Sequence, residues 1–159
     1  MLGVVDDILQ LRQPLKILLP IVASLPLTMV VGEDRVMLFP IIGFVNLGVA
    51  YPMIVVPLGV VACANLVNML AGFNGLEAGM GLIATLALSA SAFLLGSVKG
   101  LILLVPMIGA LLAFLIYNHY PAKIFPGNSG TYAIGASIAA AVIVGDMEVI
   151  GAICLAPYV

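Results

Sequence analysis

The sequence predicts an all-α, polytopic transmembrane helical bundle of about five to six spans. Of the 159 residues, 64% are hydrophobic and only 8% are charged, and the mean hydropathy is +1.33. Several apolar stretches approach the roughly 20 residues that a helix needs to cross a bilayer. We therefore expect an integral multi-pass membrane protein rather than a soluble domain. The net charge of −2 provides no basic surface, so nucleic acid is not expected as a partner.

The expected spans are separated by short polar turns. Residues 32–35 are polar and are expected to lie in water. The stretch 36–49 is apolar, but glycines interrupt it, and its β-rich runs favour a short β-hairpin over a span. No repeat or low-complexity linker divides the chain, so residues 1–159 are expected to form one domain. The expected spans are residues 17–31, 51–70, 78–95, 101–117 and 131–144, and a sixth begins near Val149.

Counting the crossings places the polar-rich segments on one side of the membrane. The chain begins there with Asp6 and Asp7, and it returns to that side at residues 72–77 and again at residues 118–130. This side has the slight excess of positive charge, which makes it the cytoplasmic side and the hairpin extracytoplasmic. Its cations are Arg12, Lys16 and Lys123, against Arg35 and Lys99 on the other side.

The first polar constellation is an adjacent pair of carboxylates, Asp6 and Asp7. Ionised groups are costly in hydrocarbon, so the pair belongs at a membrane surface. In a helix Asp6 and Gln10 would share a face, as would Arg12 and Lys16. Acids beside cations suit a phosphate-bearing substrate, because the acids can hold Mg²⁺ and the cations can hold phosphate oxygens. The alternative is a pair of solvated acids at a helix end.

The second constellation ends the second expected span. Asn65 and Asn68 are three residues apart and share a helix face, and Gly72 and Asn74 then break the helix. Glycine-rich turns leave backbone N–H groups available to an anion or a base edge. The alternative is that the two amides simply form hydrogen bonds between helices.

The third constellation is the polar and aromatic loop of residues 117–130. Asn128 or Ser129 is expected to cap the N-terminus of the fifth span, which would direct a positive helix end toward the same side as Asp6. The alternative is an aromatic belt at the membrane interface followed by an ordinary cap.

These three segments, in this order and spacing, resemble the polyprenyl-phosphate N-acetylhexosamine-1-phosphate transferases. The similarity is greatest to their eukaryotic and archaeal branch, which acts on dolichyl phosphate. That branch has the pattern NxxNxLAGxNGLEAG where this chain has residues 65–79, and GxxDDxLxLR with a following lysine where it has residues 3–16. The aspartate-rich DGLDGLA loop of the bacterial muramoyl branch is absent.

The resemblance implies an enzyme, a sugar-1-phosphate transferase. It implies transfer of N-acetylhexosamine 1-phosphate, with GlcNAc 1-phosphate expected, from a UDP-sugar to a polyprenyl or dolichyl phosphate. The products would be a lipid-diphosphate sugar and UMP, and Mg²⁺ would be the cofactor. The implied location is the cell membrane of a prokaryote or the endoplasmic reticulum of a eukaryote, with the active site facing the cytoplasm. A homodimer is a further possibility.

Roles are implied for nine positions that match the family's motifs. The paired aspartates and the lysine after them match catalytic residues near the lipid phosphate. Two asparagines match metal ligands, and the glycine-containing loop with a later aromatic residue matches the uracil site. The implied catalytic residues are Asp6, Asp7 and Lys16, the metal ligands are Asn68 and Asn128, and the substrate-binding residues are Asn65, Gly72, Asn74 and Phe125.

The chain departs from the family pattern in two ways. Asn128 stands where the family has an aspartate, and a neutral amide is a weaker ligand for Mg²⁺ than a carboxylate. The chain is also short at both ends, so it is expected to be the catalytic middle of a longer enzyme and to be inactive alone. Both departures leave open a non-catalytic paralogue that binds lipid phosphate or a partner protein. A channel or transporter is disfavoured, because polar residues do not line the middles of the spans.

Overall fold

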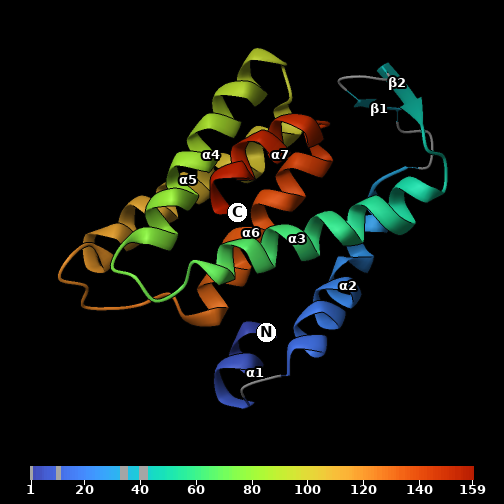
Figure 1. The fold of residues 1–159 in the computed structure, drawn as a ribbon. Helices are drawn as coiled ribbons and strands as arrows, with labels where there is room; N and C mark the ends of the chain where they lie inside the picture. The colour runs from blue at the N-terminus through green and yellow to red at the C-terminus, as the bar shows by residue number, and fades with distance from the viewer. Residues whose placement is uncertain (1, 10–11, 33–35, 40–42) are drawn as a thin grey trace.

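The protein is a bundle of helices with one small β-hairpin (Figure 1). The computed structural model describes residues 2–9, 12–32, 36–39 and 43–159. Within these ranges, four helices are long and apolar enough to cross a membrane. They are the π-helix η1 (Tyr51–Val55) continued by α3 (Val56–Met69), α4 (Leu76–Leu94), α5 (Val98–Asn118) and α6 (Gly127–Val144).

Two further apolar helices are not among these four. They are α2 (Gln13–Val30), near the N-terminus, and α7 (Glu148–Leu155), which continues into the 3-10 turn η2 (Ala156–Tyr158). Each lies where a first or sixth span is expected. The all-α multi-pass prediction is therefore confirmed, with four helices of spanning length in the described part of the chain.

The ends of α4 follow directly from the sequence. Gly75 caps its start with φ of 73°, and Gly96 follows its end with φ of 68°. This left-handed conformation carries little penalty for glycine and a real one for most other residues. The long apolar run between the two glycines therefore becomes one helix, close to the predicted 78–95.

The predicted hairpin is confirmed by its two strands. Strand β1 (Val36–Phe39) pairs antiparallel with β2 (Gly43–Asn46), with Val36 opposite Asn46. The turn that joins them, including Pro40, lies outside the described residues, as do residues 33–35 of the polar run expected in water.

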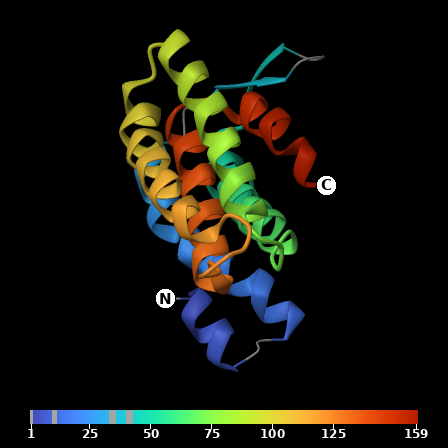
Figure 2. The same cartoon turned by 90° about the vertical axis from the view of Figure 1, so that its left-hand side faces the viewer.

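The crossing count is supported by contacts at one end of the bundle and by the position of α1 at the other. At the end that carries the hairpin, the Ser97 hydroxyl donates to the Gly145 carbonyl at 3.0 Å, and the Tyr51 hydroxyl donates to the Glu148 carboxylate. Figure 2 shows α1 (Leu2–Leu9) beyond one end of the bundle and the hairpin beyond the other. The turns α4–α5 and α6–α7 thus share one end, and α1 lies at the opposite end.

Close packing of α3 against α6 forms the centre of the bundle. A Cβ atom added at Gly135 would lie only 2.4 Å from the carbonyl oxygen of Cys63, so only glycine allows this approach. Small residues commonly permit such contacts between membrane helices. An apolar cavity of about 480 Å³ lies between α3, α6 and α7, and it is lined by residues such as Leu58, Ala139 and Leu155. None of the polar residues singled out in the sequence lines it.

One local expectation at the N-terminus is wrong. Arg12 and Lys16 do not share a helix face, because Arg12 is the extended residue that precedes α2, with φ of −65° and ψ of 148°. Pro14 in the first turn of α2 explains the restart, since proline is well tolerated there but not inside a helix. Gln10, expected to share a face with Asp6, lies outside the described residues.

Candidate active site

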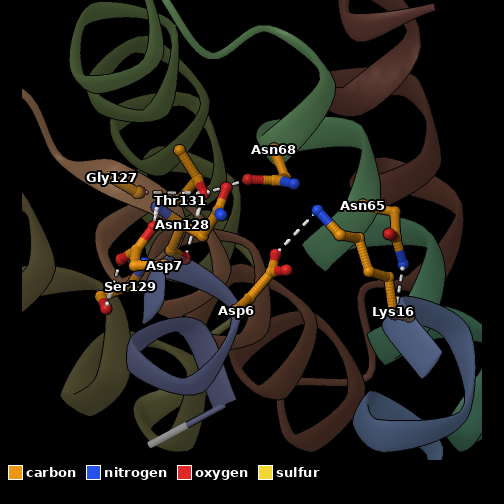
Figure 3. A network of polar contacts seen from close by, with 9 residues as sticks. All are labelled: Asp6, Asp7, Lys16, Asn65, Asn68, Gly127, Asn128, Ser129 and Thr131. Carbon is orange, nitrogen blue, oxygen red and sulfur yellow. Dashed lines mark hydrogen bonds and ion pairs between the residues drawn. The ribbon is translucent and has the colours of Figure 1, made fainter. Parts of the chain in front are cut away.

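Four helices meet at the end of the bundle that carries α1. Gly3 makes the contact possible, because a Cβ atom there would lie 2.2 Å from the Cα atom of Ser129 in α6. Figure 3 shows nine polar or turn residues gathered at this junction. They are Asp6 and Asp7 from α1, Lys16 from α2, Asn65 and Asn68 from α3, and Gly127, Asn128, Ser129 and Thr131 from α6.

Asp6 and Lys16 form an ion pair between α1 and α2. The Lys16 Nζ atom lies 2.9 Å from Asp6 Oδ2, and the two side chains are 20% and 1% exposed. A carboxylate buried this deeply needs a cation or hydrogen-bond donors close by. The pair therefore holds a negative and a positive group together at the end of the bundle that carries α1.

Asp7 caps the start of α6. Its Oδ1 atom accepts the backbone N–H of Asn128 at 2.9 Å, and its Oδ2 atom accepts the backbone N–H of Ser129 at 3.3 Å and the Ser129 hydroxyl at 3.1 Å. The first N–H groups of a helix have no partner within the helix, and a carboxylate complements the helix dipole there. The Asn128 N–H lowers the pKa of Asp7 most, opposed by partial desolvation and assisted by Ser129.

The predicted cap of this helix is therefore wrong. Helix α6 begins at Gly127, and Pro126 precedes it without a side-chain cap bond. Asn128 and Ser129 lie inside the first turn and donate their backbone N–H groups to a carboxylate from another helix. Local sequence could not indicate this contact, because Asp7 and Asn128 are 121 positions apart.

The lowered pKa of Asp7 predicts a pH-dependent stability. A carboxylate whose pKa is lower in the folded state stabilises the fold above its ordinary pKa of 3.8 and loses that contribution as the pH falls through the folded value. We expect the thermal unfolding midpoint in detergent to fall between about pH 6 and about pH 3 in the wild type, and to fall less in Asp7→Asn. Parallel curves for the two proteins would show that Asp7 does not cap α6 as an ion.

Asn68 is held in place by Thr131. The Thr131 hydroxyl lies 2.6 Å from Asn68 Oδ1 and 3.2 Å from the carbonyl oxygens of Gly127 and Asn128. Thr131 is completely buried, so its hydroxyl orients the amide of Asn68 toward the start of α6. Thr131 is not among the residues that the sequence predicts for the site. Thr131 lies three residues after Asn128, so in a helix the two share a face, and this spacing could have indicated it.

Asn65 joins α3 to α2 rather than facing open space. Its Nδ2 atom donates to the Val61 carbonyl at 2.9 Å and more weakly to the Lys16 carbonyl at 3.4 Å. The hydrogen bonding between helices that was left open for Asn65 and Asn68 is thus present. Its effect is to fix the backbone that carries the Lys16 side chain.

The remaining predicted residues lie in two loops that touch each other. Gly72, with φ of 114°, and Asn74 follow α3. The Asn74 Oδ1 atom accepts the backbone N–H of Ala122 at 3.2 Å, in the loop that leads to α6. Phe125, in that second loop, is 55% exposed. The expectation that Asp6, Asp7, Asn68, Asn74 and Asn128 lie at one membrane end agrees with these contacts, and a single cleft between them stays a prediction.

The donor atoms at the junction suit a hard cation that is shared with a substrate. Among the described residues there is no group of three or more His, Cys, Asp or Glu side chains that could hold a metal. The junction instead offers carboxylate oxygens of Asp6 and amide oxygens of Asn68 and Asn128. Mg²⁺ is commonly held by one or two carboxylates together with substrate phosphates and water, so these residues fit it.

A family model and the curated relatives agree on the protein family to which this chain is similar. A sequence model described as Glycosyl transferase family 4 matches residues 1–146. A protein of Saccharolobus solfataricus, provisionally named UDP-N-acetylglucosamine–dolichyl-phosphate N-acetylglucosaminephosphotransferase, is 45% identical over 99% of this chain and 50% of its own length. The Dictyostelium discoideum protein of that name is 32% identical over 85% of this chain and 41% of its own length.

A bacterial relative has a different name. The phospho-N-acetylmuramoyl-pentapeptide-transferase of Moorella thermoacetica is 34% identical over 87% of this chain and 47% of its own length. The chain spans about half the length of the curated relatives it matches. The family model covers most of the chain, including all three polar segments at the junction. The chain is an integral membrane protein that belongs to glycosyl transferase family 4.

Proposed function

We propose that this chain is the catalytic core of a longer membrane enzyme that transfers N-acetylglucosamine 1-phosphate from UDP-GlcNAc to a polyprenyl or dolichyl phosphate. The products are a lipid-diphosphate sugar and UMP. The observation that carries the proposal is the junction of α1, α2, α3 and α6, where the Asp6–Lys16 ion pair lies beside the amides of Asn68 and Asn128 (Figure 3). The names of the archaeal and Dictyostelium relatives supply the substrate class.

The reaction joins two negatively charged substrates. An oxygen of the lipid phosphate attacks the β-phosphorus of the UDP-sugar, the bond from that phosphorus to the bridging oxygen breaks, and UMP leaves. A phosphate monoester is already largely ionised near pH 7, so the nucleophile needs little help from a base. The larger difficulty is bringing the charges together, and positioning with charge neutralisation is how proteins assist phosphoryl transfer.

Lys16 is suited to this task because its ammonium group can hold a phosphate oxygen. Asp6 keeps that ammonium in place, and Asn65 holds the backbone that carries it. Asp6, Asn68 and Asn128 are the residues that would hold Mg²⁺. When bound, Mg²⁺ neutralises pyrophosphate charge and so favours departure of UMP. Asp7 contributes differently, because its hydrogen bonds fix the start of α6, where Asn128 lies.

The uridine end of the donor is proposed to bind at the two touching loops. Phe125 exposes its ring, which gives a base a surface on which to stack. Asn74 uses its Oδ1 atom to hold Ala122, so its Nδ2 group is the part that remains for a base carbonyl. The backbone of Gly72 can approach a ligand closely because no side chain covers it.

We also propose that this end of the bundle faces the cytoplasm. It carries Arg12, Lys16 and Lys123, and the excess of lysine and arginine sets the orientation of membrane proteins. The membrane would be the cell membrane in a prokaryote and the endoplasmic reticulum in a eukaryote. UDP-sugar and lipid phosphate would then meet at the cytoplasmic surface of the bilayer.

A transfer assay tests the proposal. Membranes from cells that express the complete reading frame encoding this chain are mixed with UDP-GlcNAc and dolichyl phosphate. We expect UMP to form only when both substrates and Mg²⁺ are present, and to stop when EDTA removes the metal. Dolichyl phosphate binding without any UMP formation would instead support the non-catalytic paralogue that Asn128 leaves open.

A further inference from the structure

Glu77 is a buried acid at the end of the bundle that carries the candidate active site, and the proposed reaction assigns it no role. It lies in the first turn of α4, and its side chain is completely buried. An acidic side chain removed from water at a membrane end is costly unless it forms compensating contacts. Its partners therefore indicate what it does.

Glu77 reaches back to the loop that contains Gly72. Its Oε1 atom accepts the backbone N–H of Gly72 at 2.7 Å. A glutamate in the first turn often takes the N–H of the residue that caps its own helix. Here it passes the cap, Gly75, and holds a residue three positions earlier. The bond closes the loop of residues 72–77 with Gly72 in a left-handed conformation, φ 114°.

The loop held by Glu77 is also tied to its neighbours. Asn74, two residues after Gly72, accepts the N–H of Ala122. Gly75 packs against the end of α5, where a Cβ atom would lie 3.5 Å from the Asn118 carbonyl oxygen. Asn118 in turn donates to the Ile124 carbonyl at 2.8 Å. Glu77 is the fully buried acidic residue among these contacts, and it fixes the turn that carries Gly72 and Asn74, the residues proposed to bind uridine.

We propose that Glu77 is a positioning residue that fixes the Gly72–Asn74 loop for binding of the uridine nucleotide. This inference rests on the proposed function. Because Glu77 acts through the Gly72 backbone, we expect its effect to fall on the UDP-sugar and not on the lipid phosphate.

The second carboxylate oxygen of Glu77 makes the expected effects of two substitutions, Glu77→Gln and Glu77→Ala, different. Glu77 Oε2 is buried and has no hydrogen-bond partner among the described residues. Glutamine at this position keeps an oxygen for the Gly72 N–H, and its NH₂ group replaces an atom that accepts no hydrogen bond here. Glu77→Gln therefore preserves the loop, whereas Glu77→Ala removes its anchor. A group that moved a proton would instead be impaired in both variants, because glutamine cannot transfer a proton, and a metal ligand would be weakened in both, because an amide is a weaker ligand than a carboxylate.

The test measures KM for UDP-GlcNAc, KM for dolichyl phosphate and kcat in the complete protein. We expect Glu77→Ala to raise KM for UDP-GlcNAc by about tenfold, as loss of a buried hydrogen bond does, with KM for dolichyl phosphate unchanged. Glu77→Gln is expected to restore the KM for UDP-GlcNAc. Thr85→Val is the matched control, because Thr85 is an equally buried polar residue of α4 whose hydroxyl, among the described residues, bonds within its own helix.

Hydrogen exchange of the peptide covering residues 70–76 gives a second readout that does not need activity. We expect faster exchange in Glu77→Ala and unchanged exchange in Glu77→Gln and Thr85→Val. Unchanged KM for UDP-GlcNAc in Glu77→Ala, an equal rise of both KM values, or a Glu77→Gln variant as impaired as Glu77→Ala would overturn the inference while leaving the proposed function intact. A wild type that produces no UMP would overturn both.

Discussion

Asp6→Asn is expected to lower the rate of sugar-phosphate transfer by about a hundredfold or more. The substitution keeps the shape of the side chain but removes the charge that holds Lys16, 2.9 Å away. Removing one partner of a buried ion pair leaves the other charge without compensation and free to move away from the phosphates. It also removes the carboxylate proposed to hold Mg²⁺. The measurement is kcat at saturating UDP-GlcNAc and dolichyl phosphate.

Asp146→Asn is the control for this substitution. Asp146 lies in the α6–α7 turn at the opposite end of the bundle, with φ of 56°. Asparagine tolerates this left-handed conformation about as well as aspartate, so the backbone of this turn should keep its conformation. We expect full activity from Asp146→Asn. An Asp6→Asn protein that is folded and retains wild-type kcat would exclude Asp6 from the chemistry.

Asn128→Asp is expected to raise Mg²⁺-dependent transfer and to increase the apparent affinity for Mg²⁺, each by about tenfold. The added carboxylate supplies charge beside the proposed metal. The backbone of Asn128 should stay in place, because its N–H is bound by Asp7. The new charge also lies close to Asp6 and Asp7, and neighbouring carboxylates repel unless a cation lies between them.

This repulsion between carboxylates predicts a second effect of Asn128→Asp, on the unfolding temperature. Without Mg²⁺, Asn128→Asp should unfold at a lower temperature than the wild type, and added Mg²⁺ should stabilise the variant more strongly. Asn128→Ser, which stays neutral, is the control and should show neither effect. If rate, metal affinity and metal-dependent stability all remain as in the wild type, Asn128 is not a metal-site residue.

The positions of the helices and the hairpin could be predicted because they depend on local properties. The apolar length of each segment and the glycines at its ends determine where α4 begins and ends, and the glycine-interrupted runs after residue 35 determine the hairpin. The break between α1 and α2 was missed, although Pro14 marks it. The prediction assumed one continuous helix from Arg12 to Lys16, whereas Pro14 favours the start of a new helix there.

The site could be predicted as a set of residue types but not as a set of contacts. The contact by which Asp7 caps α6 was not predicted, because it depends on Gly3, which lets α1 lie against the first turn of that helix. The action of Asp7 on substrate or metal stays a prediction. Thr131 and Glu77 were passed over for the same reason, since their importance depends on what the fold brings beside them. Hydrogen bonds between residues more than 60 positions apart, such as Thr131 to Asn68, leave no periodic signal in a single sequence.

The most direct measurement follows the β-phosphorus of UDP-GlcNAc. With a radioactive label at that position, dolichyl phosphate and Mg²⁺, the complete protein is expected to place the label in the lipid and to release unlabelled UMP. The transfer should stop in EDTA and in Asp6→Asn, and it should persist in Asp146→Asn. Label that remains in released UDP would show that the sugar moves without its phosphate, and label that remains in UDP-GlcNAc would show that the junction of α1, α2, α3 and α6 performs no transfer.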